Sequence, residues 1–565
     1  MGKTQLSEKC ISTQVCLWLL MFWPVLPLLN STRLPPNVFF ISECIAIFVA
    51  LLIGLFALPS LYRAGGIQVP RIVLLPAGLM LILVVQMQVL PQLVIEHAEM
   101  GFLYLFWVIL IMTFVFSLKN QLGIQRIAFY LAIGLLLASV YSASLEVYER
   151  LYQLPESWGN IAQANNYGDF LALGFASGLY LLTRHQAKKE YYYAAMALIV
   201  LGLSLTASRS VWLYWFAMIV ITSLCLTKQR RIVVVGLVLY VIFQIIWAND
   251  FLFSAATSAE KMYHASSGTS VRGHIWQVAW QIFTQSPWLG GGFGQFDWDY
   301  FNAGMHIPNV RTRMEHAHNL ILHLLAEMGV FSVLILVSML AVWVRGVVKK
   351  VTVTNEREGA VWLLMLVAIL GIHSLLEYPL WYATLLGIAA SILALGETKS
   401  YRLRLSGVSA SALALLLVVA LGVTAIHTWQ YKQLQLALFD NKEVSQKKKE
   451  AHFFSITQKI PLYAPLLTPY VTGVLALLSK PEDKAIRQDL TLLTQANYQF
   501  RAQKVMVYLY VEMLALTGKR EAAEVLMKKT MLAYSGGEEA YLKMLEGLDA
   551  EDRKKIEFLK EIVSK

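Results

Sequence analysis

Apolar runs of about 20 residues recur along the first three quarters of this chain, with short charged links between them. A helix of that length crosses the hydrocarbon core of a bilayer. The runs must be helical because lipid offers the backbone no hydrogen-bond partner, and they lack the period-two alternation of barrel strands. Only 15% of the residues are charged, whereas soluble domains hold about a quarter. We therefore predict an all-α polytopic membrane protein.

We place about 13 membrane helices in a transmembrane domain of residues 1–428. The first run, Val15 to Leu29, contains Pro24 and Pro27 and has no clean small-residue cleavage site. It is therefore interpreted as a membrane helix rather than a signal peptide. The four cysteines have the spacing of neither a metal site nor a disulfide framework. The predicted spans are residues 15–30, 38–58, 72–90, 102–118, 126–145, 169–183, 191–207, 210–227, 232–248, 319–344, 360–376, 379–396 and 405–427.

Lysine and arginine are concentrated in every second link, and the positive-inside rule places those links in the cytoplasm together with the N-terminus. This bias explains much of the net charge of +11, so no nucleic-acid partner is expected. An odd number of spans then leaves the C-terminus outside. The links predicted on the outer side are Gln88–Gly101, Glu146–Tyr167, Ser208–Arg209, Asn249–His318 and His373–Tyr378.

Residues 429–565 differ in composition from the apolar part. They are rich in Lys, Glu, Ala and Leu, and apolar residues recur at helical spacing, as at Val505, Leu509 and Met513. We predict a small α-helical domain there, on the outer side, with two-helix repeats as a weaker interpretation because no fixed period emerges.

Two histidines end the long polar loop Asn249–His318, in the sequence Glu315-His316-Ala317-His318-Asn319 at the mouth of an apolar helix. Two histidines with one adjacent glutamate provide few ligands for a metal ion. Asn319 is also a good residue for capping the helix that follows. A neutral imidazole at a helix mouth is, in addition, suited to accept a proton from a hydroxyl near physiological pH. Further along the helix, His323 and Glu327 are spaced to pair across one turn in a structural role.

Two arginines on the predicted outer side are candidates for binding phosphate. Arg272 lies in the long loop, where simple solvation is an equally good explanation. Arg209 lies at the outer end of two apolar runs with no acidic neighbour in the sequence, where it either extends to the headgroups or meets a partner. A guanidinium binds two phosphate oxygens at once and keeps its charge.

Two further polar segments face the same side. The amide-rich segment Gly159–Asp169 includes Gln163, Asn165 and Asn166, which either cap a helix or bind sugar hydroxyls. The segment His373–Tyr382 places His373 and Glu377 one helical turn apart, followed by Tyr378 and by a proline at residue 379 that suits a helix start. Its aromatic residues suit either the membrane interface or a sugar-stacking surface.

These motifs resemble a known family. The pair His318-Asn319, nine residues and then Gly329 resemble the signature of the bacterial O-antigen ligase superfamily. The segment His373–Tyr382 and the amides of Gly159–Asn166 are similar to its protein-glycosylating branch, the PglL-type O-oligosaccharyltransferases. One departure is the alanine between the two histidines, where serine is common.

The resemblance implies a GT-C-like, inverting glycosyltransferase of the bacterial inner membrane with its active site in the periplasm. Its donor would be an undecaprenyl-pyrophosphate-linked oligosaccharide, and its acceptor a serine or threonine of a periplasmic protein such as a pilin. His318 would be the catalytic residue, and Arg209 and Arg272 would hold the pyrophosphate, with no metal or cofactor. The residues expected to support this site or to bind sugar or acceptor are Glu315, His316, Asn319, Gln163, Asn165, Asn166, His373, Glu377 and Tyr378.

Three alternatives remain from the sequence. The same chemistry with another acceptor would give a ligase acting on lipid A–core or a glycan polymerase. A transporter of lipid-linked sugars predicts polar residues at mid-membrane depth and repeated halves, and neither pattern is found in the sequence. A scaffold that recruits pilins would leave His318 dispensable.

Overall fold

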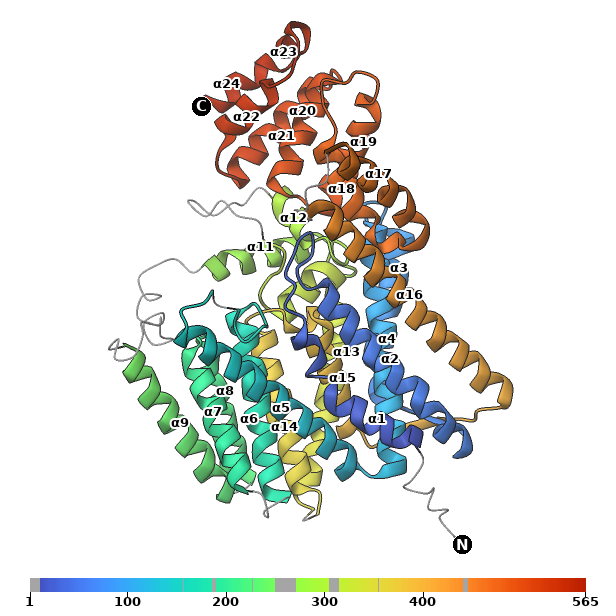
Figure 1. The fold of residues 1–565 in the computed structure, drawn as a ribbon, viewed down its shortest axis with the longest axis vertical. Coiled ribbons are helices and arrows are strands. Elements are labelled where there is room, and N and C mark those ends of the chain that lie inside the picture. Colours follow the sequence, from blue (N-terminus) through green and yellow to red (C-terminus); the bar gives the residue numbers. More distant parts are fainter. Residues whose placement is uncertain are drawn as a thin grey trace. The chain divides into compact units, whose positions relative to one another are not determined.

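The computed structural model describes residues 11–155, 157–184, 189–225, 227–248, 271–303, 314–353, 355–439 and 446–564, and these are almost entirely helical (Figure 1). Two parts of the predicted loop, residues 249–270 and 304–313, lie outside these ranges, as do the N-terminal lysines at positions 3 and 9. The helices up to α16 are α1 Ile11–Phe22, α2 Phe40–Arg63, α3 Leu74–Val89, α4 Ile95–Leu122, α5 Ile124–Leu151, α6 Ala164–Arg184, α7 Lys189–Leu205, α8 Ser210–Cys225, α9 Thr227–Ala248, α11 Val271–Gln285, α12 Phe296–Asn302, α13 Leu320–Val351, α14 Arg357–Ser374, α15 Ala383–Gly396 and α16 Gly407–Phe439. The later helices are α17 Gln446–Tyr463, α18 Thr468–Leu478, α19 Arg487–Phe500, α20 Lys504–Leu516, α21 Arg520–Ala533, α22 Gly537–Leu545, α23 Ala550–Ile556 and α24 Lys560–Val563. Short 3₁₀ turns are η1 Leu26–Leu29, η2 Arg71–Val73, η4 Pro379–Trp381, η5 Pro465–Leu467 and η6 Glu557–Leu559.

Within the described part of the chain, eight helices are long and apolar enough to cross a membrane: α2, α3 with η2, α4, α5, α9, α13, α14 and α16. Each of the 13 predicted spans overlaps a helix, and the protein is a mostly helical, multi-pass membrane protein. The other five predicted spans fall on helices that do not reach that length or hydropathy, so the number 13 stays a prediction.

The chain packs as two compact units. Unit 1 consists of Met1–Leu79, Tyr104–Gly268 and Leu334–Thr428, and unit 2 of Met80–Leu103, Thr269–Val333 and Trp429–Lys565. Unit 2 therefore contains the predicted tail domain together with two segments from the predicted transmembrane domain. That the tail folds as a domain of its own stays a prediction.

Helix α6 lies at the centre of unit 1, and every residue from Asn166 to Leu182 is buried. Small residues allow this close packing: a Cβ on Gly174 would lie 2.1 Å from Oγ of Ser139 on α5, and one on Gly178 would lie 2.7 Å from Met196 on α7. Close approach through glycine is typical of helix contacts in membranes, where van der Waals packing stabilises association.

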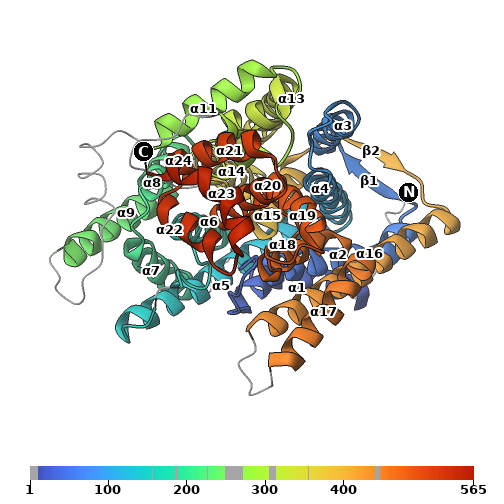
Figure 2. The same ribbon diagram turned by 90° about the horizontal axis from the view of Figure 1, so that it is seen from above.

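A two-stranded antiparallel sheet joins two links of unit 1. Strand β1, Ile67–Pro70, pairs with β2, Ser400–Leu403, so that Ile67 lies opposite Leu403 and Pro70 opposite Ser400 (Figure 2). Both strands come from links that the charge pattern assigns to one side of the membrane, as their pairing requires.

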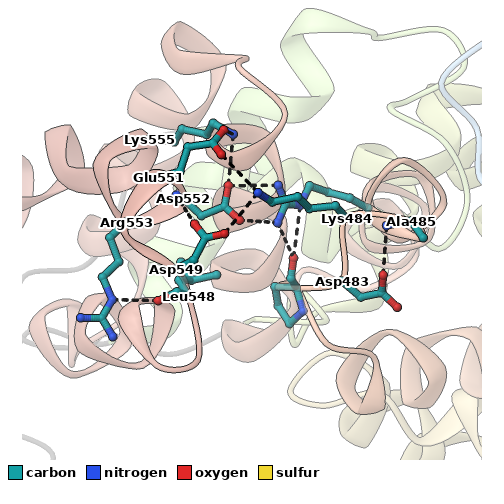
Figure 3. Close-up of polar contacts among 11 residues, drawn as sticks. Asp483, Lys484, Ala485, Leu548, Asp549, Glu551, Asp552, Arg553 and Lys555 are labelled. Carbon is teal, nitrogen blue, oxygen red and sulfur yellow. Dashed lines mark hydrogen bonds and ion pairs between the residues drawn. The ribbon is translucent and has the colours of Figure 1, made fainter.

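In unit 2, helices α18, α19 and α20 each pack against the next helix along the chain. Their core contains Val507, Val511 and Met527, and it also contains Phe301 from α12. In the tail, Nη1 and Nη2 of Arg487 lie 3.1 and 2.6 Å from the two carboxylate oxygens of Asp552. Nearby, Nζ of Lys484 lies 3.2 Å from Asp549 and 3.3 Å from Glu551 (Figure 3).

The long loop predicted at residues 249–318 is partly helical, since α11 and α12 lie within it. Helix α11 buries Ile275, Val278, Ala279 and Ile282, which follow the i, i+3, i+4, i+7 spacing of an amphipathic helix. Arg272, expected in a loop, therefore lies in the first turn of a helix.

Candidate active site

The histidine segment is fixed to the start of α13 by Asn319. Its side-chain oxygen accepts a hydrogen bond from the backbone N–H of Leu322 at 3.1 Å, and its carbonyl accepts one from the N–H of His323 at 2.9 Å. The predicted capping role of Asn319 is therefore confirmed. The preceding residue, His318, has φ +50°, a left-handed conformation that few non-glycine residues adopt. Such conformations cost about 1–3 kcal/mol and concentrate at functional sites.

A chain of contacts runs from the histidine segment along α13. The rings of His316 and His323 lie 5.0 Å apart, and the N–H of Ala317 donates to Nδ1 of His323 at 3.4 Å. Nε2 of His323 lies 3.4 Å from Oε2 of Glu327, with both side chains buried. The predicted pairing across one helical turn is therefore confirmed, and it supports the backbone between the two loop histidines.

Glu327 is held in turn by the first residue of α12 and the loop before it. One carboxylate oxygen accepts from the N–H of Gly294 at 2.9 Å and the other from the N–H of Phe296 at 3.1 Å. The ring of Phe296 also lies 5.2 Å from that of His323. A buried carboxylate with these donors is a fixed anchor rather than a free base.

The glycine of the predicted signature breaks α13. Gly329 has φ +72° and ψ −175°, and a Cβ there would lie 2.2 Å from the carbonyl oxygen of Trp288. The N–H of Val330 donates to the carbonyl of Pro287 at 2.9 Å, which replaces a bond inside the helix. Only glycine fits this break, because both the backbone angles and the neighbouring backbone exclude a side chain.

Gln86 was not singled out by the sequence analysis, yet its fully buried amide holds the same break together. It donates to the carbonyls of Leu289 at 2.5 Å and Glu327 at 2.7 Å, and it accepts from the N–H of Phe293 at 3.3 Å. A lone glutamine in an apolar run was the available signal, because a polar group inside a membrane helix needs partners within the protein.

Arg272 and the histidine segment are linked through α11. The indole N–H of Trp276 donates to the carbonyl oxygen of Ala317 at 3.0 Å. Arg272 lies four residues before Trp276 and therefore on the same face of the helix. The structure thus places a guanidinium on the helix face that contacts the loop containing His318. Glu315, at the other end of that loop, forms an ion pair with Arg501 of the tail.

The amide segment and the segment around His373 meet in unit 1. Oε1 of Gln163 accepts from the N–H of Asn166 at 3.0 Å at the start of α6, so the capping interpretation holds for this amide. Nδ2 of Asn165 donates to Oε1 of Glu377 at 2.8 Å. One turn further along α6, Oδ2 of Asp169 lies 3.2 Å from Nδ1 of His373, and both side chains are fully buried.

Asp169 was overlooked as a partner, although an acidic residue at the start of an apolar run was a visible signal. Tyr378 packs its ring against Tyr382, with centroids 6.1 Å apart. Pro379 begins η4, as its fixed φ predicts. Gln163, Asn165, His373 and Glu377, which were predicted to bind sugar or acceptor, therefore each contact another side chain or the backbone of the protein.

Arg209 is exposed in the turn between α7 and α8, and its side chain forms no ion pair within the described ranges. It belongs to unit 1 with Gln163 and His373, whereas His318 and Arg272 belong to unit 2. That Arg209 and His318 share one cleft therefore stays a prediction. Among the described residues, no three His, Cys, Asp or Glu side chains are grouped so as to hold a metal ion.

Comparison with known proteins agrees with this architecture. The family model described as O-antigen ligase matches residues 194–337, which contain Arg209, Arg272, His318 and Gly329. A second model, described as the C-terminal part of a virulence factor membrane-bound polymerase, matches residues 361–544. These two matches support the resemblance to the O-antigen ligase superfamily that His318-Asn319 and Gly329 indicate.

The chain is also similar to a curated protein with a more specific activity in its name. The chain is 24% identical over 388 residues to a general O-oligosaccharyltransferase of Acinetobacter baylyi. The alignment covers 62% of this chain and 65% of the relative, which is less than two thirds of that protein's length.

Proposed function

We propose that this protein is an inverting O-oligosaccharyltransferase. It moves a glycan from an undecaprenyl-pyrophosphate carrier to a serine or threonine hydroxyl of a periplasmic protein, such as a pilin. The single observation that supports this most strongly is His318, held in a left-handed conformation beside the Asn319 cap and next to the carbonyl that Trp276 of the Arg272 helix binds. The likeness to a general O-oligosaccharyltransferase supports the choice of acceptor.

In this mechanism His318 accepts the proton of the acceptor hydroxyl as its oxygen attacks the anomeric carbon. The bond from that carbon to the pyrophosphate oxygen breaks on the opposite face, so the configuration inverts. Arg272 and Arg209 stabilise the negative charge that builds on the departing pyrophosphate, which makes the reaction independent of a metal ion. The transmembrane helices hold the carrier lipid in the inner membrane, with the site on the periplasmic side.

A His318→Ala variant tests the base directly. We expect normal insertion and abundance and no glycan on the acceptor, measured by mass spectrometry of periplasmic proteins. His427→Gln is a control, because His427 is a histidine outside the loop that bonds only to the Val423 carbonyl of its own helix among the described residues. Wild-type glycosylation by the His318 variant would exclude the proposed base.

Arginine-to-lysine variants test the phosphate contacts. Arg209→Lys and Arg272→Lys are each expected to reduce turnover of the lipid-linked donor, because an ammonium cannot bind two oxygens in parallel. Unchanged turnover in both would argue against a bidentate contact. Activity is expected to survive a chelator, and recovery of a lost activity on adding metal would contradict the mechanism.

The identity of the acceptor distinguishes an O-oligosaccharyltransferase from a ligase or a polymerase. The two family matches carry the names of a ligase and a polymerase, so the same transfer onto lipid A–core or onto another glycan is the second candidate. Purified protein with one lipid-linked donor is offered a pilin-like protein, lipid A–core, or a second lipid-linked glycan. The product that gains the sugar identifies the function, and transfer only to the latter two would overturn the protein acceptor.

A further inference from the structure

A short segment of the tail contacts the histidine loop within unit 2. Arg501 lies between α19 and α20, and its Nη2 is 2.9 and 3.0 Å from the two carboxylate oxygens of Glu315. Glu315 directly precedes His316. The side chains are 30% and 43% exposed, and an ion pair so open to solvent contributes little to stability. The Arg501–Glu315 ion pair therefore affects the position of the histidine loop more than the stability of the fold.

The segment that carries Arg501 is itself fixed at each neighbouring residue. Nε2 of His97 lies 2.8 Å from the carbonyl oxygen of Phe500, and the two rings stack with centroids 4.4 Å apart. The N–H of the fully buried Ala502 donates to Asp297 of α12 at 3.1 Å. The hydroxyl of Tyr534 donates to the carbonyl of Ala502. Arg501 therefore projects from a backbone with little freedom, which lowers the entropy cost of its ion pair.

Helix α12 is fastened to the tail at its other end. Phe301 packs against the rings of Tyr498 and Tyr534, and Asn302 accepts hydrogen bonds from Tyr498 and Lys529. The first residue of the same helix donates its N–H to Glu327, the anchor of the buried pair on α13. The tail thus contacts the histidine segment twice, directly at Glu315 and indirectly through α12.

We propose that Arg501 is a positioning residue for the transfer reaction. It fixes the Glu315 end of the loop while the Asn319 cap fixes the other end, so that the tail sets the orientation of His316 and His318. This inference rests on the proposed function. A loop of five residues held at both ends keeps the imidazole in one arrangement, whereas release of one end lets it sample many. Misplacement of a reacting group by about 1 Å lowers rates by up to about 100-fold.

Charge reversal in the full-length protein tests this directly. Arg501→Glu and Glu315→Arg are each expected to lower kcat at least about 10-fold with little change in the KM for the donor, because the binding groups stay in place. The double variant, which restores an opposite-charge pair, is expected to recover much of kcat. Glu315→Gln is a milder variant for the case that a reversed charge prevents folding. The matched control reverses Lys543 and Glu539, an exposed ion pair 3.4 Å apart within α22.

A second measurement does not depend on activity. Hydrogen exchange of the Met314–Asn319 amides, followed by mass spectrometry without substrate, is expected to be faster in Arg501→Glu and Glu315→Gln than in the wild type and in the control. Absence of glycan transfer by the wild type would contradict the proposed function and leave this readout intact. A wild-type kcat in Arg501→Glu, failure of the double variant to recover, or unchanged exchange would each overturn the positioning role.

Discussion

Replacing Gly329 with alanine tests the account of the break in α13. The new Cβ would lie 2.2 Å from the carbonyl oxygen of Trp288, 2.4 Å from its carbonyl carbon and 2.7 Å from the nitrogen of Leu289. All three are backbone atoms, which do not yield by a simple rotation. The angles φ +72° and ψ −175° also lie in a region that is essentially confined to glycine.

The cost has two parts. Holding a non-glycine residue at these angles costs about 1–3 kcal/mol. Forcing a methyl group into a packed contact costs about 1–3 kcal/mol more. A destabilisation of about 2–6 kcal/mol is a large part of the roughly 5–15 kcal/mol that stabilises a typical native protein.

The assay is thermal unfolding of the detergent-purified protein, followed together with glycan transfer. Gly329→Ala is expected to unfold at a clearly lower temperature and to lose transfer activity. Gly346→Ala is the matched control: it lies in the same helix with no atom within 4 Å of its new Cβ, so it is expected to be neutral or slightly stabilising. Equal unfolding temperatures for the two variants would refute the reasoning.

Three further predictions concern buried ionisable groups. Asp169→Ala removes the partner of the fully buried His373 and is expected to lower stability by about 3–5 kcal/mol in thermal unfolding; an unchanged unfolding temperature would contradict the pairing. Burial raises the pKa of Glu512 to about 8, so the folded state retains a proton that the unfolded state loses between about pH 4.5 and 8, and stability falls as pH rises through that range. Glu512→Gln is therefore expected to protect the tail from limited proteolysis at pH 9 and to have little effect at pH 5, and equal effects at both values would be inconsistent with it. The guanidinium of Arg487 lowers the pKa of Asp552, so that pair stabilises the fold above the ordinary aspartate pKa of about 3.9 and is lost as pH falls further. Acid sensitivity of the tail, measured by the same proteolysis, is expected to be smaller in Asp552→Asn.

Local patterns predicted their part of the structure well. The apolar runs all fall on helices because lipid leaves the backbone no alternative. The Asn319 cap and the pairing of His323 with Glu327 were readable because their partners lie within one helical turn. The helix at Val271–Gln285 was equally readable from its spacing, but the polar character of the surrounding loop concealed it.

Contacts between distant segments were not readable. The pairs of Asp169 with His373 and of Glu315 with Arg501 join residues about 200 positions apart, and no local pattern specifies them. A lone polar residue in an apolar run signals that a partner exists, as for Gln86, but it does not name the partner. The sequence therefore indicated which side chains matter more reliably than what they contact.

The spacing of the signature now has a physical meaning. Asn319 starts a helical segment and Gly329 ends it, so the nine residues between them are two and a half turns of helix that place His323 and Glu327 on one face. One alanine inserted after Leu325 would rotate Glu327 by about 100° and remove it from the N–H groups of Gly294 and Phe296. We expect loss of glycan transfer together with a lower unfolding temperature, whereas the same insertion after Thr352, in the turn that follows α13, is expected to be tolerated. Full activity in the variant with the insertion after Leu325 would contradict the claim that the nine-residue spacing sets the length of this helical segment.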